Sequence, residues 1–155
     1  MATEWLSPDE QHAWRTYVET ARDLSAVLEA ELEPHGVSHG DYEVLVHLSE
    51  APDHRMRMCD LSSALRLSPS GLTRRLDTMV RNGWVERRAC EYDRRVLYAH
   101  LTPEGFTKLE DAAPTHVDGV RRHLVQPLGP DDMAALGRLF TKVRQHLASE
   151  GLSRQ

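Results

Sequence analysis

The sequence has few of the features that mark secreted, membrane-bound or disordered proteins. Its 155 residues include two cysteines, Cys59 and Cys90, which do not make a disulfide framework. No hydrophobic run reaches the ~18 residues that a bilayer span requires. The N-terminal residues lack the basic and apolar regions of a secretory signal. With 40% hydrophobic and 28% charged residues, and without repeats or low-complexity segments, the chain is predicted to be a single folded domain, 1–155, in the cytoplasm.

Charge is distributed unevenly along the chain. The formal net charge is −5, from 19 basic and 24 acidic residues, yet segment 55–95 contains ten arginines and five acidic residues. A basic segment between acidic ends suggests a polyanionic partner, although a solvated charged face would have the same composition. All ten basic residues are arginine, whose guanidinium binds phosphate and guanine edges through two hydrogen bonds at once.

Hydrophobic spacing and capping signals predict six helices and a hairpin. Ser7 is a predicted N-cap, Asn82-Gly83 a helix stop, and Pro114 a kink inside a helix. Segment 51–54 is predicted to be a loop. In chain order, the predicted elements are a helix from Pro8 to the Pro34-His35-Gly36 break, helices over 41–48, 59–67 and 69–81, strands over 84–89 and 96–101, a helix from Pro103, and a final helix after Leu128-Gly129-Pro130.

This order of elements predicts a winged helix, a helix–turn–helix followed by a β-hairpin. The fold class is therefore mainly α with a small β-hairpin wing. The first and last helices lie outside that module, and their apolar stripes need a partner. In the last helix the apolar residues recur in steps of three and four, as in a heptad: Met133, Leu136, Phe140, Val143 and Leu147.

The predicted helix 69–81 has the character of a DNA-reading helix. At 100° per residue, one face carries the apolar residues Leu72, Leu76, Met79 and Val80. The opposite face carries Ser70, Arg74 and Arg81, with Thr73 and Arg75 at its edges. Short hydroxyl side chains and an arginine near a helix N-terminus suit the major groove, where Arg74 would bind guanine. Ser70 and Thr73 would reach bases or phosphates, and Arg75 a phosphate. The alternative is an ordinary amphipathic surface helix.

The predicted hairpin tip carries Asp93-Arg94-Arg95. Two arginines at the end of a two-stranded ribbon suit insertion into a minor groove. Charged residues at a hairpin tip also simply blunt exposed strand edges. Because the reading helix and the arginine-tipped hairpin occur together and in this order, DNA binding is the favoured interpretation.

Four segments make the sequence similar to the MarR family of bacterial transcriptional regulators. They are Gly71-Leu72-Thr73-Arg74, Asn82-Gly83-Trp84-Val85-Glu86-Arg87, Asp93-Arg94-Arg95 and Leu101-Thr102-Pro103-Glu104-Gly105. The resemblance extends to Asp41-Tyr42-Glu43-Val44-Leu45 and to the two C-terminal helices, so it spans nearly the whole chain. It implies a homodimer in which 1–36 and 103–155 form the dimerisation helices and 37–102 the winged helix. It also implies a repressor that binds a pseudo-palindromic operator.

The resemblance also implies roles for individual residues. Arg74 would read a base, Arg95 would be the wing arginine, and Asp93 would orient the wing. The full set expected to contact DNA is Ser68, Ser70, Thr73, Arg74, Arg75, Asp93, Arg94 and Arg95.

Members of this family commonly bind a small anionic aromatic effector that weakens DNA binding. The candidate lining residues here are Arg22, His39 and Tyr42, with Trp14 nearby. The alternative is that Trp14 and Tyr42 are core residues.

Other sensing chemistries have weaker support in the sequence. Peroxide-sensing relatives keep a cysteine near the start of the first helix, and this chain has none there. Cys59 resembles a small residue at a helix start. A redox role for Cys90 stays open. Zinc-sensing relatives carry two histidines four apart on the fifth helix, whereas His116 and His123 are seven apart, so no metal ligands are assigned.

The sequence also bears on two wider interpretations, an enzyme and a protein-binding adaptor. No catalytic motif is recognisable, so neither an enzyme nor a cofactor is expected. Within DNA binding, the alternative is a metal- or redox-responsive regulator of the same fold. A winged-helix dimerisation or adaptor protein that binds protein is the alternative from a different class.

Overall fold

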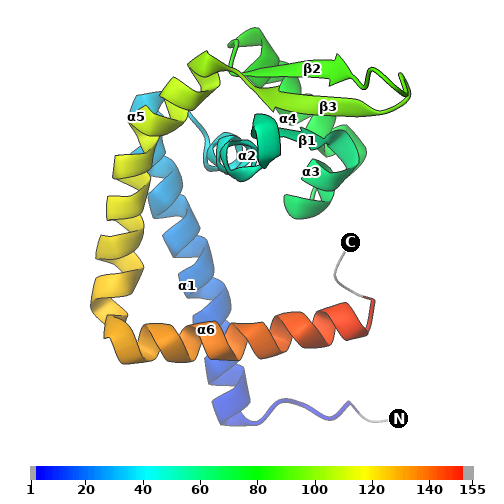
Figure 1. The fold of residues 1–155 in the computed structure, drawn as a ribbon. Coiled ribbons are helices and arrows are strands. Elements are labelled where there is room, and N and C mark those ends of the chain that lie inside the picture. The colour runs from blue at the N-terminus through cyan, green and yellow to red at the C-terminus, as the bar shows by residue number, and fades with distance from the viewer. Residues whose placement is uncertain (1–2, 152–155) are drawn as a thin grey trace.

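The structure is a computed structural model that describes residues 3–151. Its elements form two groups that lie apart, and α5 connects the two groups (Figure 1). One group is the winged helix, built from α2, α3, α4 and a small sheet; the other contains α1 and α6, which cross. The helices are α1 (Pro8–Leu32), α2 (His39–Glu50), α3 (Met58–Ala64), α4 (Pro69–Arg81), α5 (Pro103–Val120) and α6 (Gln126–Ser149), and the strands are β1 (Arg55–Arg57), β2 (Val85–Ala89) and β3 (Leu97–Leu101). Short helical segments cover Glu33–His35 (η1), Pro52–His54 (η2) and Arg121–Val125 (η3).

Helix starts follow the capping signals of the sequence. At α1 the Ser7 hydroxyl accepts a hydrogen bond from the Glu10 amide, and the Glu10 carboxylate accepts one from the Ser7 amide at 2.8 Å. At α5 the Thr102 hydroxyl accepts from the Gly105 amide and donates to the Gly83 carbonyl at 2.6 Å. Because Gly83 lies in the turn before β2, this one hydroxyl ties α5 to the winged helix.

The sheet has three strands in the order β1-β3-β2, all antiparallel. The hairpin of β2 and β3 agrees with the prediction, but β1 was missed because its three residues carry no periodicity of their own. Pairing with β3 creates this strand, through Arg55 opposite His100 and Arg57 opposite Tyr98. The helix–turn–helix with its wing is thus completed by a strand that only tertiary contacts define.

The main hydrophobic core lies inside the winged helix. Its buried residues are Val44, Leu45, Leu48, Leu61, Leu72, Leu76, Met79, Val85 and Ala99. The prediction that Val80 faces this core was wrong, since its side chain is 39% exposed. Val80 follows Met79 by one residue, which turns it about 100° around the helix, to a rim that Asp77 and Arg87 also line.

The last two helices join through an irregular turn. α5 continues through Pro114, where a kink was predicted, and the departures from α-helical geometry come later, in the π-helical η3 and at Gly129 (φ 71°, ψ 175°). Contacts on either side of Pro114 hold α5 in place, because His35 bonds both Asp111 and Thr115. A proline removes only one helical hydrogen bond, so a helix fixed by such contacts can run past it.

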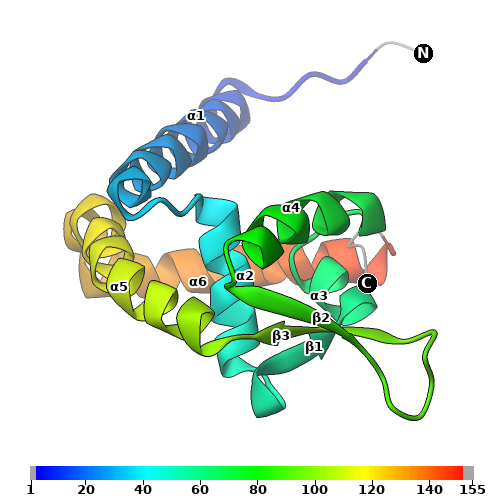
Figure 2. The same ribbon diagram turned by 90° about the horizontal axis from the view of Figure 1, so that it is seen from above.

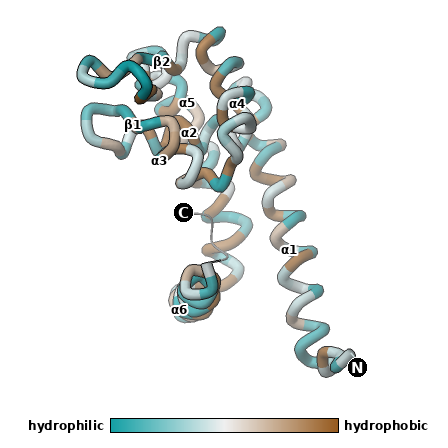
Figure 3. The backbone as a smooth tube through the Cα atoms, turned by 90° about the vertical axis from the view of Figure 1, so that its right-hand side faces the viewer, coloured by the Kyte–Doolittle hydropathy of each residue, from teal (hydrophilic) through white to brown (hydrophobic). Residues whose placement is uncertain are grey.

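α1 and α6 expose much of their apolar surface. Figure 3 shows hydrophobic positions recurring between hydrophilic ones along α1. No residue of α6 is buried. Tyr17 of α1 contacts both Trp14, with ring centroids 6.0 Å apart, and Phe140 of α6, at 5.2 Å. No helix within residues 3–151 is long and apolar enough to span a lipid bilayer.

Candidate nucleic-acid interface

α4 presents a polar face that is not used in packing. Ser70, Thr73 and Arg74 are exposed, as the helical wheel predicted. The Ser68 hydroxyl caps α4 by accepting from the Gly71 amide at 3.1 Å, and the Thr73 hydroxyl donates to the Pro69 carbonyl at 2.9 Å. Among the residues that the structure describes, none forms a hydrogen bond or ion pair with the Arg74 guanidinium. Arg74 is therefore available to an external acceptor.

Arg75 points toward α2 instead. Its guanidinium lies 3.6 Å from the Asp41 carboxylate. It also lies against Gly40, where a Cβ would overlap the guanidinium. In this arrangement the Arg75 side chain joins α4 to α2. Its predicted contact with a DNA phosphate is not tested by the structure and stays a prediction.

Arg87 of β2 holds α4 in place, a role that sequence reasoning missed. Its guanidinium donates to the Thr73 carbonyl and to the Asp77 carboxylate, both at 2.8 Å. β2 carries residues alternately on its two faces, and Arg87 shares the inner face with Val85. An arginine at an inward-facing strand position was the signal in the sequence, because such a group needs a partner on the packed helix.

The wing loop between β2 and β3 extends past the helices (Figure 2), and side-chain hydrogen bonds fix its turn. The Asp93 carboxylate accepts from the Arg95 amide at 3.0 Å and from its guanidinium at 3.1 and 3.2 Å. These bonds from Arg95 hold the pKa of Asp93 below its usual value. Arg94 is exposed, so both wing arginines remain at the surface while Asp93 fixes the backbone between them. That Asp93 orients the wing on DNA, as the resemblance implies, stays a prediction.

The four candidate effector residues do not come together. His39 and Tyr42 lie beside His116 of α5, with ring centroids at 5.4 and 4.4 Å. Trp14 instead lies with Tyr17, and Arg22 is exposed on α1. Burial raises the pKa of Tyr42 and lowers that of His116.

Histidines also pair with carboxylates where the end of α1 and the short η1 meet α5 and η3. His35 Nδ1 lies 2.9 Å from Asp111, and His123 Nε2 lies 2.9 Å from Glu31, which also binds Arg122. Within residues 3–151, no group of three or more histidine, cysteine or acidic residues is placed to hold a metal ion. Of the cysteines, Cys59 is exposed and Cys90 half-buried, both unlinked.

Known structures match this chain over nearly its whole length. A family model described as MarR family matches residues 37–97. The structure of AbsC, a MarR family transcriptional regulator from Streptomyces coelicolor, has a TM-score of 0.91 and 42% identity, over 95% of this chain and 99% of AbsC. Sco3205, a regulator of that family from the same organism solved in complex with DNA, has a TM-score of 0.90 and 36% identity, over 94% and 92%.

Curated relatives give a similar result over shorter stretches. The transcriptional repressor YetL of Bacillus subtilis is 31% identical over 96 residues, which are 62% of this chain and 58% of YetL. The transcriptional regulator PecS of Dickeya dadantii is 27% identical over 128 residues, 81% of this chain and 76% of PecS. The match thus spans less than two thirds of YetL and about three quarters of PecS. These relatives are named as regulators of transcription, not as enzymes.

Proposed function

Since this chain belongs to the MarR family of transcriptional regulators, we propose that it binds an operator in duplex DNA and represses transcription there. The observation that carries the proposal is Arg74 on the exposed face of α4, which has no partner within residues 3–151, together with a wing whose Arg94 and Arg95 are exposed. In this proposal α4 enters the major groove and the wing an adjacent minor groove. Arg74 binds a guanine, and the neighbouring hydroxyls and wing arginines add further contacts.

The proposal includes a homodimer. The support is the apolar surface that α1 and α6 leave exposed, including Leu139, Phe140 and Val143. A second copy of the chain would cover it, with 1–36 and 103–155 as the dimerisation region and 37–102 as the winged helix. Two-fold symmetry then places two α4 helices about one turn of DNA apart, roughly 10 bp between half-site centres.

A small anionic aromatic effector is the third part of the proposal. Tyr42, His39 and His116 adjoin where α2 meets α5, so a compound bound there would bear on the orientation of the winged helix. The effect would be a shift between dimers that fit the operator and dimers that do not. Titration of the operator complex with benzoate and 2-hydroxybenzoate tests this, with release of DNA as the expected result; unchanged DNA affinity would contradict it for these acids.

Selection of bound sequences from a random duplex pool, at fixed and stated salt, tests the central proposal. We expect a pseudo-palindrome with half-sites about 10 bp apart. The same selection with Arg74→Ala should recover a motif that is relaxed at one position in each half-site. Recovery of no enriched sequence at low salt would favour the adaptor alternative, in which the winged helix binds protein.

A further inference from the structure

The outer face of the three-stranded sheet carries charged and aromatic side chains that take no part in the DNA contacts proposed for α4 and the wing tip. Strand register places them in two rows across the sheet. One row is Arg57, Tyr98 and Arg88, and the other is Arg55, His100 and Glu86. These two rows contain three arginines and one carboxylate, and two further carboxylates, Asp53 and Asp60, lie beside Arg55 and Arg57. We call the six residues of the two rows the outer-sheet strip.

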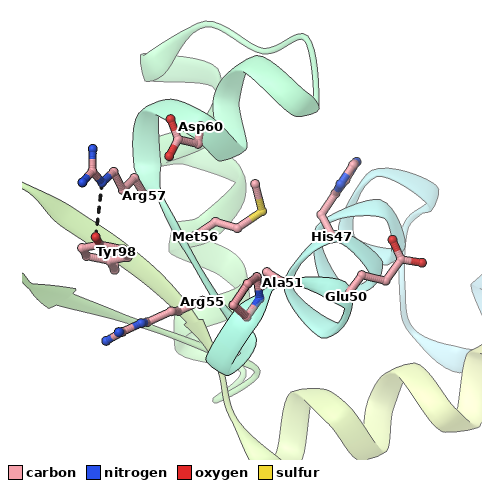
Figure 4. A pocket seen from close by; sticks show the side chains of 9 residues that line it. His47, Glu50, Ala51, Arg55, Met56, Arg57, Asp60 and Tyr98 are labelled. Atoms are coloured by element: carbon pink, nitrogen blue, oxygen red, sulfur yellow. Dashed lines mark hydrogen bonds between the residues drawn. The ribbon is translucent and has the colours of Figure 1, made fainter.

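The contacts within the strip hold two of its arginines around an aromatic ring (Figure 4). Arg57 Nε donates to the Tyr98 hydroxyl at 3.2 Å, and the Arg55 guanidinium carbon lies 5.4 Å from the centre of the Tyr98 ring. Arg55 is also 3.4 Å from Asp53, and Arg88 Nε donates to Glu86 at 2.8 Å. Arg57 therefore differs from the other two, because its hydrogen-bond partner is a neutral phenol. The bond to Tyr98 raises the pKa of Arg57, and the nearby Asp60 carboxylate, which acts on it only through space, helps to raise it.

The strip is continuous with the candidate DNA interface at both ends. Arg88 lies on β2, the strand that leads into the wing with Arg94 and Arg95. Arg57 is the N-cap residue of α3, the first helix of the helix–turn–helix. In such motifs the first helix crosses the DNA backbone while the second enters the groove. The strip thus connects two places that face the DNA backbone in the proposed complex.

We propose that the outer-sheet strip binds phosphates of duplex DNA beyond each half-site, so that the bound DNA follows the side of the wing. This inference rests on the proposed function. Duplex DNA fits the strip because Arg57 and Arg88 stand two strand spacings apart, about 9–10 Å, which is too wide for one small anion but not for a polyanionic backbone. Arginine side chains on a sheet read no bases in this position; they add affinity and set how much DNA is covered.

Two duplexes distinguish this surface from the reading helix. Both contain the selected operator; one ends at the half-sites and the other adds about one helical turn on each side. For the unmodified protein we expect tighter binding to the long duplex and a steeper dependence of affinity on salt. Arg57→Gln and Arg88→Gln should each make the salt slope on the long duplex shallower by about 0.9, the value for one lost phosphate contact. Together they should abolish the preference for the long duplex.

The matched control is Arg121→Gln. Arg121 is an exposed arginine 3.6 Å from an acidic partner, Asp118, at the far end of α5, so its loss should leave both slopes unchanged. If the unmodified protein binds both duplexes equally, or if the strip variants keep the long-duplex slope, the strip is not a DNA surface even though operator binding stands. Failure to bind either duplex would instead count against the proposed function.

His100 provides a reporter that does not depend on affinity. Burial, Arg88 and Arg55 lower its pKa, while Glu86 acts in the opposite direction. DNA phosphates close to the strip would offset the two guanidinium charges and raise that pKa. Titration of the His100 ring by NMR should therefore show a higher pKa with the long duplex than with the short one. Equal values with both duplexes would overturn the proposal.

Discussion

Arg74 differs from its neighbours on α4 in having a guanidinium without a partner among the residues described. The hydroxyl groups of Ser68 and Thr73 form hydrogen bonds with the helix backbone, and the Arg75 guanidinium faces the Asp41 carboxylate. Sequence reasoning placed all four in the DNA-contacting set. In the structure the four residues differ in how many hydrogen-bonding groups are already used within the protein. Arg74 has the most hydrogen-bond donors left for a DNA base.

We predict that Arg74→Ala weakens operator binding by roughly 1–3 kcal/mol and relaxes specificity at one position. Arg74→Lys should keep most of the salt dependence, because the charge remains, yet lose the discrimination, because lysine lacks the planar fork. Binding to a panel of operators with single base-pair changes measures both effects. A lysine variant that discriminates as well as the original would assign Arg74 to a phosphate.

His116 should make the folded protein less stable in acid. Burial is the main cause that lowers its pKa from 6.5, and His39 adds to it, whereas Glu43 and Glu31 oppose it. The unfolded chain then binds the proton more readily, so stability is fully present above about pH 6.5 and is lost as the pH falls toward the lower pKa of the folded state.

We therefore predict that His116→Phe flattens the thermal stability profile between pH 7.5 and 5. Phenylalanine keeps the ring against Tyr42, and it loses no hydrogen bond, because His116 Nδ1 is buried without a partner in the described part of the chain. His146→Phe, at an exposed position of α6, is the control and should keep the original slope. An unchanged slope in His116→Phe would show that other groups cause the acid sensitivity.

At the scale of elements, capping residues and hydrophobic spacing predicted those helices and strands that depend mainly on their own residues. The bounds of α4 agree with the prediction, because Ser68 caps one end and Asn82-Gly83 stops the other. β1 could not be predicted, because it exists through its pairing with β3. The contacts of Arg87 with Thr73 and Asp77 were missed for the same reason, since these residues meet only when the sheet packs on α4.

Gly105 shows how closely α5 approaches the turn before β2. A Cβ at this position would overlap the Trp84 carbonyl oxygen and lie 2.8 Å from Leu101 Cδ1. We predict that Gly105→Ala destabilises the protein by about 1–3 kcal/mol, as overpacking does, because a backbone carbonyl cannot move aside easily. Gly137→Ala on α6 has open space around it in the subunit and should stabilise by about 0.5–1 kcal/mol. Chemical denaturation of the two variants would measure both, and a neutral Gly105→Ala would show that the turn is free to shift.

At the scale of the whole molecule, the proposed dimer would complete the hydrophobic packing that one chain leaves unfinished. Val143 of α6 is 52% exposed in the single chain, so a lysine there should not disturb its folding. We predict that Val143→Lys gives a folded monomer with much weaker operator binding, because one winged helix reaches only one half-site. Sedimentation equilibrium and circular dichroism test the two parts separately. A dimeric Val143→Lys protein would place the interface elsewhere.

The absence of any buried residue in α6 has a consequence for dosage. If the apolar residues of this helix become buried only when a second copy binds, the dimer that recognises an operator forms in proportion to the square of the subunit concentration when subunits are scarce. Occupancy of the promoter would then respond to the number of subunits in the cell more steeply than in proportion. A modest change in synthesis or degradation of the protein would thus act as a threshold for the genes it controls.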